Sequence, residues 1–474
     1  MIQSIVTVLL LLLPVICFAA GGESVSGAHL DGSSMSVFWV IPFAGLLGSI
    51  AFIPLWSRSF WHAHYGKISA FWAVLVLLSL MWSYPLPVVA YEFFHVMGLE
   101  YLPFIILLGT LFIITGGIEL TGTLKGTPVG NFLILLFGTA IASWIGTTGA
   151  AMLLIRPLIR ANQWRQKKAY IVVFFIFLVA NIGGALTPLG DPPLFLGFLK
   201  GVNFFWTTTH LFWPMVLISS ILLGLFFIID QYFYKKEPAS KHPNPKHIEP
   251  IGIVGKHNIV LLVGVVLLVL MSGLWDSRIV FHFGLISIEL QSLVRDLGLI
   301  LLSIISLKTT SKKIYVENGF TWFPIVEVSK LFAGIFITII PVVTILKAGL
   351  SGPLKPLIEV VQTSTGDPIN TAYFWVTGIH SSLLDNAPSY LIFFNAAGGD
   401  ALILMTTLSK TLLAISLGAV FMGGLTYIGN APNFMILAIA EEHDIDMPSF
   451  FGYVFKYSVP ILVPLFILIG LIFL

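Results

Sequence analysis

Two short stretches of the sequence carry polar groups whose types and spacing could bind an ion. The first, 181–196 (NIGGALTPLGDPPLFL), and the second, 423–434 (GGLTYIGNAPNF), share the pattern L-T-x-x-G-[D/N]-x-P-x-F. Asp191 and Asn430 occupy the same place in the two patterns and are 239 residues apart, about half of the 474-residue chain. The chain therefore contains an internal repeat, and both copies present hydroxyl and carboxyl or amide groups.

Neither stretch can stay helical at its centre. In the first, the seven residues 187–193 contain three prolines, a glycine and a carboxylate, and proline and glycine interrupt a helix. Inside a bilayer, such a break is tolerated only where it lies against protein or lines a water-filled cavity. Substrate and ion sites of secondary transporters are built at helix breaks of this kind.

The composition indicates an integral membrane protein. Hydrophobic residues make up 57% of the sequence and charged residues 10%, and the mean hydropathy is +0.98. A soluble domain has about 25% charged residues, so there is too little charge here to cover a water-facing surface. The net charge of +2 and the lack of a basic run give no indication of nucleic-acid binding. The single cysteine, Cys17, excludes an internal disulfide and a cysteine-based metal cluster.

The N-terminal segment has the pattern of a signal peptide. An apolar run over 5–20 is followed by small residues around Gly21, which is typical of a cleavage site. The first basic residue is Arg58, so the positively charged start of a signal peptide is missing, and a retained first helix is the alternative. We predict a signal peptide at 1–20 and a short extracytoplasmic segment at 21–36.

Apolar segments of about 20 residues, the length that a helix needs to span a bilayer, follow one another without a soluble domain between them. The most polar stretch, 235–258, lies near mid-chain and is the predicted cytoplasmic loop between a first repeat, 37–234, and a second repeat, 259–474. The predicted segments are 37–56, 68–89, 101–118, the pair 129–145 and 150–159, 170–198, 211–233, 259–274, 286–307, 325–346, the pair 372–384 and 389–397, 411–440 and 453–474.

The distribution of lysine and arginine predicts that the two halves are inverted. Short loops rich in these residues mark the cytoplasmic side. All basic loops lie on that side only if 129–159 enters and leaves there as a re-entrant hairpin, with its tip at 146–149. The same count makes 372–397 a hairpin from the opposite side, with its tip at 385–388. The predicted fold is an all-α membrane protein with an inverted-topology repeat, in which each half has about five spans, one of them broken, and one re-entrant hairpin.

Two hairpin tips and two helix breaks can meet near the bilayer midplane, where inverted-repeat transporters place their sites. Hydroxyl, amide and carboxylate oxygens suit a hard cation such as sodium. Intramembrane carboxylates are costly and are functional candidates by default. Because burial favours the protonated form of a carboxyl group, protons and sodium could compete for one site. The candidate ion- or substrate-binding residues are Thr147, Thr148, Thr187, Asp191, Asp385, Asn386, Thr426, Asn430 and Asn433, with Asp191, Asp385 and Asn386 as sodium ligands.

Each candidate also has a structural interpretation. Asp191 and Asp385 could cap the half-helices that follow them. The threonines of the first tip could bind carbonyl groups of a tight turn, and Asn430 and Asn433 could satisfy the backbone of the broken helix. His380, five residues before Asp385 on the hairpin arm, is more typical of a structural histidine.

The sequence resembles the ion transporter superfamily, which includes citrate and dicarboxylate carriers and the arsenite and NhaD-type sodium/proton antiporter families. The likeness covers essentially all of the mature chain and is greatest to a group described as citrate transporters or sodium/proton antiporters. It is carried by GTTGAAMLLIRPLIRAN, TPLGDPPLFLGFLKG, LLDNAPSYL and IGNAPNF. The resemblance also implies a scaffold domain, a transport domain and a homodimer.

Two of these motifs look like those of the NhaD-type antiporters, in which the matching aspartate and asparagine positions serve cation and proton binding. They are 384–388 (LDNAP) and 188–191 (PLGD). At the first tip, 146–148 (GTT) stands where that family carries acidic residues. Carboxylate carriers of the superfamily have Ser-Asn-Thr at the tips, and neither tip of this chain matches that pattern.

We therefore expect a secondary active transporter of the bacterial inner membrane that exchanges sodium for protons. Its expected partners are the lipid bilayer and a small ion or carboxylate, with sodium and protons as coupling ions, no further cofactor and no nucleic acid. A cation-coupled carrier of citrate or another carboxylate is the alternative. An intramembrane enzyme is disfavoured because the sequence has no H-E-x-x-H pattern and because four symmetric breaks exceed what a catalytic dyad needs.

Overall fold

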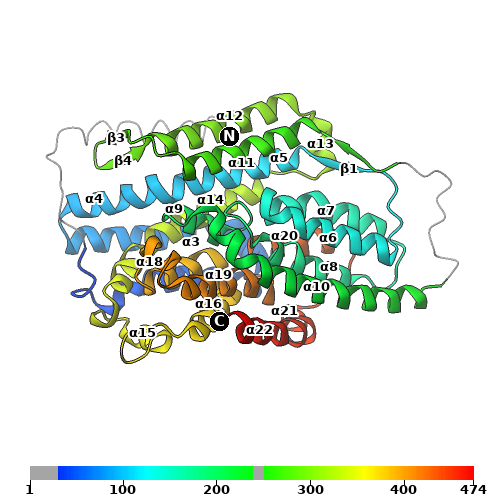
Figure 1. Ribbon diagram of the computed structural model, residues 1–474. Helices are drawn as coiled ribbons and strands as arrows, with labels where there is room; N and C mark the ends of the chain where they lie inside the picture. The colour runs from blue at the N-terminus through cyan, green and yellow to red at the C-terminus, as the bar shows by residue number, and fades with distance from the viewer. Residues whose placement is uncertain (1–29, 239–249) are drawn as a thin grey trace.

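The computed structural model describes residues 30–238 and 250–474. The predicted signal peptide lies outside the described residues, as do most of 21–36 and the centre of the mid-chain loop. The regular structure of the described part is almost entirely helical (Figure 1). Two short antiparallel strand pairs are the exceptions: β1 (Glu119–Thr121) with β2 (Gly252–Val254), and β3 (Val280–Phe283) with β4 (Ile286–Glu289).

Within the described residues, nine helical segments are long and apolar enough to cross a membrane. The expectation of an all-α, multi-pass membrane protein is confirmed. The helices of the first half are α2 (Ile41–Trp56), α3 (Arg58–Ser83), α4 (Leu86–His95), the π-helix η3 (Val96–Tyr101), α5 (Leu102–Gly116), α6 (Pro128–Ile145), α7 (Thr147–Ala161), α8 (Ala169–Leu178), α9 (Pro192–Leu199) and α10 (Phe204–Lys236). Those of the second half are α11 (His257–Leu274), α12 (Leu290–Thr309), α13 (Lys312–Glu317), α14 (Phe323–Lys347), α15 (Lys355–Val361), α16 (Asn370–Leu384), α17 (Asn386–Ala396), α18 (Ala401–Met405), α19 (Ser409–Met422), α20 (Ala431–Glu442), α21 (Phe450–Tyr453), the π-helix η8 (Val454–Ser458) and α22 (Val459–Phe473).

The outer helices expose large apolar side chains. On α11, for example, Val260 is 71% exposed and Leu267 is 58% exposed. Such surfaces suit a lipid environment, whereas α8 and α19 are buried along nearly their whole length in the centre of the molecule. Lipid-facing helices therefore surround the polar breaks, which is the arrangement that a bilayer requires.

At both predicted hairpins the chain forms a pair of packed helices, α6 with α7 and α16 with α17; that these pairs are re-entrant stays a prediction. Each pair is joined by one residue with a positive φ angle, Gly146 (φ 81°, ψ 146°) and Asp385 (φ 91°, ψ 142°). These two residues are separated by the offset of the sequence repeat. The second arms begin three residues earlier than predicted, because one residue in this conformation suffices to reverse the chain.

Both predicted helix breaks are also present. α8 and α9 are separated by a segment that includes a short 3-10 helix, η4 (Ile182–Gly184), and α19 is followed by η7 (Gly423–Leu425) before α20 begins. A glycine closes each break: a Cβ atom added to Gly190 would lie 2.1 Å from the Gly184 carbonyl oxygen, and one added to Gly429 would lie 2.5 Å from that of Gly423. The glycines of the shared pattern are therefore required by close backbone approach.

The two halves exchange partners in the centre. α7 packs against α20 and α9 packs against α17, so the second arm of each hairpin contacts the helix that follows the break of the other half. In Figure 1, β1, which precedes the first hairpin, lies on the right side, and α15 and α18, which flank the second hairpin, lie on the left side. The predicted inverted topology requires such an arrangement; the orientation of the halves in a membrane stays a prediction.

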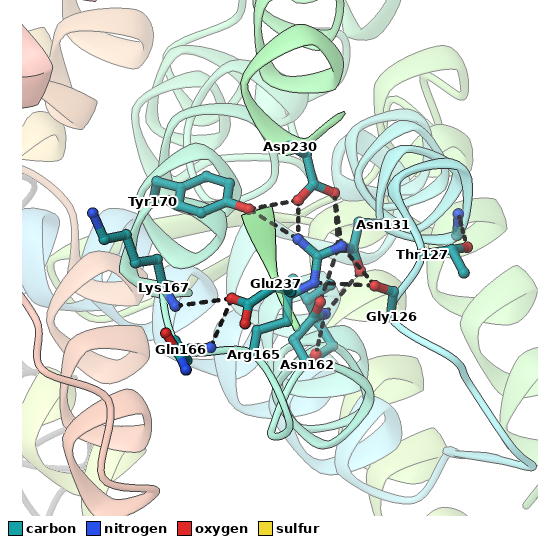
Figure 2. A network of polar contacts seen from close by, with 12 residues as sticks. Gly126, Thr127, Asn131, Asn162, Arg165, Gln166, Lys167, Tyr170, Asp230 and Glu237 are labelled. Carbon is teal, nitrogen blue, oxygen red and sulfur yellow. Dashed lines mark hydrogen bonds and ion pairs between the residues drawn. The ribbon is translucent and has the colours of Figure 1, made fainter. Parts of the chain in front are cut away.

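A buried polar network holds the base of the first hairpin (Figure 2). Asp230 on α10 pairs with Arg165 and accepts hydrogen bonds from the Tyr170 hydroxyl (2.5 Å) and from Asn131 Nδ2 (3.0 Å). Arg165 also donates to the carbonyl oxygen of Gly126 through Nη2 (2.6 Å). Arg165 lies in one of the basic loops that the charge distribution places on the cytoplasmic side, but its side chain is fully buried, because an acidic partner 65 residues away neutralises it.

Candidate functional site

Four helices begin around one point in the centre of the protein. They are α7 at Thr147, α9 at Pro192, α17 at Asn386 and α20 at Ala431. Each start is prepared locally, by a positive-φ hinge in the two hairpins and by proline in the first turn after the two breaks. Helix N-termini carry positive partial charge, and a single carboxylate connects these four segments.

That carboxylate belongs to Asp191, which is 1% exposed. Its Oδ1 accepts hydrogen bonds from Thr147 Oγ1 (3.1 Å) and Asn430 Nδ2 (3.0 Å), and its Oδ2 accepts one from Asn386 Nδ2 (2.5 Å). The backbone N–H of Thr147 also donates to the Gly190 carbonyl oxygen (2.8 Å). Both hairpin tips and the second break thus meet at the carboxylate of the first break.

The donors to Asp191 follow the internal repeat. Thr147 and Asn386 are counterparts at the 239-residue offset, as are Asp191 and Asn430. Asp191 (φ −144°, ψ 142°) and Asn430 (φ −154°, ψ 138°) also share one backbone conformation. The site therefore consists of two equivalent pairs of residues, in which only one of the two break positions carries a charge.

The capping interpretation separates the two aspartates. Asp191 stands at the N-cap position of α9 but makes no capping hydrogen bond. Asp385 does cap α17, because its Oδ1 accepts the N–H of Ala387 at 3.1 Å. Asp385 is half-buried and directly precedes Asn386, whose Nδ2 atom binds Asp191. The structure thus brings both predicted carboxylates together.

The two predicted break threonines share two hydrogen bonds. Thr187 Oγ1 donates to the carbonyl oxygen of Ser143, and Thr426 Oγ1 donates to that of Ser382 (2.5 Å). Each hydroxyl also accepts an N–H from two residues further on, at 3.2 Å in both cases. These contacts tie each break to the first arm of its own hairpin, which positions the residues around Asp191. Thr148 lies half-buried in the first turn of α7, outside the described contacts of Asp191.

Two asparagines connect the two breaks. They are Asn433, which was among the predicted site residues, and Asn181, which was not. Asn433 Nδ2 donates to the carbonyl oxygens of Gly423 and Thr426, both at 2.9 Å. Asn433 Oδ1 accepts from Asn181 Nδ2 (2.8 Å), and Asn181 Oδ1 accepts from Asn430 Nδ2 (3.3 Å). Asn181 is fully buried. An asparagine at the end of a wholly apolar run was the available sequence signal.

One acceptor beside Asp191 remains open. The Oδ1 atom of Asn386 is buried and has no hydrogen-bond partner within the described chain, while the Nδ2 atom of the same amide binds Asp191. A buried acceptor without a donor costs about 1–3 kcal/mol. The centre therefore offers a carboxylate, an open amide oxygen and a hydroxyl, a set of oxygen ligands that hard cations prefer.

Comparisons with known proteins agree with a transport role. Residues 32–474 match the family described as "Putative citrate transport". An uncharacterized transporter of Mycobacterium bovis and another of Mycobacterium tuberculosis are each 25% identical over 368 residues, which cover 73% of this chain and 80% of the relative. A 46 kDa membrane protein of Mycobacterium leprae is 26% identical over 332 residues, covering 67% of this chain and 71% of that protein.

Proposed function

This chain belongs to that family of membrane transport proteins, and we propose that it exchanges sodium ions for protons at the carboxylate of Asp191. One observation carries the proposal. Asp191 is completely buried, and its hydrogen-bond partners Thr147, Asn386 and Asn430 are all neutral. No lysine or arginine forms an ion pair with Asp191 in the described part of the chain.

A buried carboxylate without a compensating charge is unfavourable by several kcal/mol. A proton or a bound cation must therefore neutralise Asp191. If a proton and a sodium ion can each bind to Asp191 but cannot bind at the same time, binding of sodium releases the proton. The fluxes of sodium and protons are then coupled. Asp385 adds a second negative charge nearby, and the open Oδ1 of Asn386 adds a neutral ligand for the cation.

Purified protein in liposomes with an internal pH dye tests the proposal. We expect an imposed sodium gradient to move protons in the opposite direction, and lithium, which has the same charge and similar ligand preference, to substitute in part. Sodium that moves no protons, together with proton movement on addition of citrate alone, would overturn sodium/proton exchange.

A cation-coupled carrier of citrate or another carboxylate is the second candidate. The family description names citrate transport, and four helix N-termini meet at the site, where they favour an anion. Because two carboxylates are already present, a cation would have to bind before the anion. We place either transporter in the bacterial inner membrane; the homodimer implied by resemblance stays a prediction.

A further inference from the structure

A cavity of about 540 Å³ lies at the far end of two of the helices that begin at the central site. α9 runs from Asp191 to Lys200, and α17 runs from Asn386 to the region of Asn395; Lys200 and Asn395 both line the cavity. The remaining walls come from α4, the π-helix η3, α14 and residues 30–32. At 1.5 Å per residue, α9 places this cavity about 12 Å from Asp191.

The lining of the cavity is charged and slightly acidic. It contains three carboxylates, Asp31, Glu92 and Glu100, against two ammonium groups, Lys200 and Lys347. Three helices, α9, α14 and α17, also end here, and helix C-termini carry negative partial charge. The field in the cavity therefore favours a cation over an anion.

One carboxylate of the cavity, that of Glu100, is already paired with a lysine side chain. Lys200 Nζ forms an ion pair with Glu100 Oε1, and the side chains are 22% and 11% exposed. Glu100 lies in the π-helix η3, an irregularity that is frequent at functional sites. Lys200 directly follows α9, so the pair connects the helix that begins at Asp191 to the wall of the cavity.

We propose that this cavity is the access vestibule for the transported cation on the face where residues 30–32 lie. Glu100 is the carboxylate that receives the cation. The ammonium group of Lys200 occupies the cation's position beside Glu100 until the cation arrives, and so competes with it. When a sodium ion takes the position beside Glu100, the ammonium of Lys200 is released, and the end of α9 loses its link to η3. The inference rests on the proposed function, because the cation that enters the vestibule is the one proposed to bind at Asp191.

Transport in membrane vesicles of both orientations tests the roles of the pair. Lys200→Met should lower the KM for sodium added on the vestibule face several-fold, since the competitor is gone. Glu100→Gln should raise it several-fold, and both variants should leave the KM on the opposite face unchanged. The exposed pair Lys355–Glu359 on α15 is the matched control, and Lys355→Met should change neither KM. Equal changes on both faces, or a loss of kcat alone, would show a merely structural pair and overturn the proposal.

A second measurement tests the vestibule even if sodium is not exchanged for protons. Thr344 lines the cavity, and Thr344→Cys in a Cys17→Ala background should react with a charged, water-soluble thiol reagent from the vestibule face, more slowly when sodium is present. Leu267→Cys on the lipid-facing side of α11 should not react. An unreactive Thr344→Cys overturns the vestibule, and protection by citrate but not by sodium overturns its cation specificity. Absence of sodium/proton exchange in a chain that labels as expected would instead overturn the proposed function.

Discussion

At the residue scale, the two carboxyl groups of the site differ in what they already bind. Asp385 has a structural task, because it reverses the chain and caps α17. Asp191 has none of this kind: its oxygens accept hydrogen bonds from side chains of three other segments and cap no helix. A residue that is costly to bury and performs no local structural task is the better candidate for the coupling group.

Asp191→Asn should abolish sodium-dependent proton movement while the protein still folds, since the amide keeps the shape and loses the charge. Proton flux in liposomes measures this loss.

The internal repeat allows a second test, in which the charge is moved to the equivalent position. Because Asn430 has the same conformation and lies at 3.0 Å from Asp191, the exchange Asp191→Asn with Asn430→Asp returns one charge to the centre and should restore part of the transport. Asn430→Asp alone places carboxylates at both break positions and should impair transport. A double variant as inactive as Asp191→Asn would show that the two positions are not equivalent. Proton flux in liposomes is the measurement.

Asp385→Gly separates the backbone role of this residue from its charge. Its counterpart is Gly146, and a non-glycine residue in this conformation carries about 1–3 kcal/mol of strain. Glycine loses only a few tenths of a kcal/mol at an N-cap, so the unfolding temperature in detergent should stay the same or rise. We expect sodium-coupled proton movement to be lost. Full transport by this variant would exclude Asp385 from ion binding.

At the element scale, the hairpins and breaks could be predicted because glycine, proline and aspartate mark them locally. The turns at Gly146 and Asp385 lie within the predicted tips. The close contact of Gly190 with Gly184 gives the physical reason for the glycine of the shared pattern. The partners of Asn181 and Asp230 could not be predicted, because they come from segments that only the tertiary fold brings together. The donors of Asp191 were all among the candidates, but a single sequence does not show which oxygen they bind.

Gly190→Ala tests the geometry of the first break. The new methyl group would meet the Gly184 carbonyl oxygen at 2.1 Å, a backbone contact that cannot give way easily. We expect a loss of stability of at least about 1–3 kcal/mol and a loss of transport. Gly224→Ala in α10 is the matched control: it has open space around it and should gain up to about 1 kcal/mol. Thermal unfolding and flux assays on both variants measure these effects. Normal stability and transport in Gly190→Ala would contradict the observed break.

The network at the base of the first hairpin should be sensitive to the loss of one charge. Removing one partner of a buried ion pair costs about 3–5 kcal/mol, so Arg165→Met should lower stability strongly by leaving Asp230 unpaired. Adding Asp230→Asn should recover much of that loss, because the uncompensated charge is removed. Denaturation of the wild type, both single variants and the double variant measures the effect. Additive losses in the double variant would show that the charges do not act as a pair.

At the scale of the whole molecule, the two hairpins should be anchored at opposite faces of the membrane. Lys125, before α6, and Thr365, before α16, are both exposed. With Cys17→Ala, we expect Lys125→Cys to react with an impermeant thiol reagent only from the cytoplasmic side and Thr365→Cys only from the other side. Labelling of both from one side would rule out the inverted repeat.

The near-equivalence of the two halves at the centre has a consequence for the direction of transport. Thr147 at the start of α7 and Asn386 at the start of α17 both bind the carboxylate of Asp191, so an ion that approached along α7 would meet a hydroxyl and one that approached along α17 would meet an amide. The backbone conformation is the same on the two sides, but the side chains that line them differ. The equilibrium ratio of the ions cannot depend on this difference, whereas the rates under reversed gradients can. The protein should therefore behave as a kinetic rectifier, running faster in one direction than in the other under gradients of equal size.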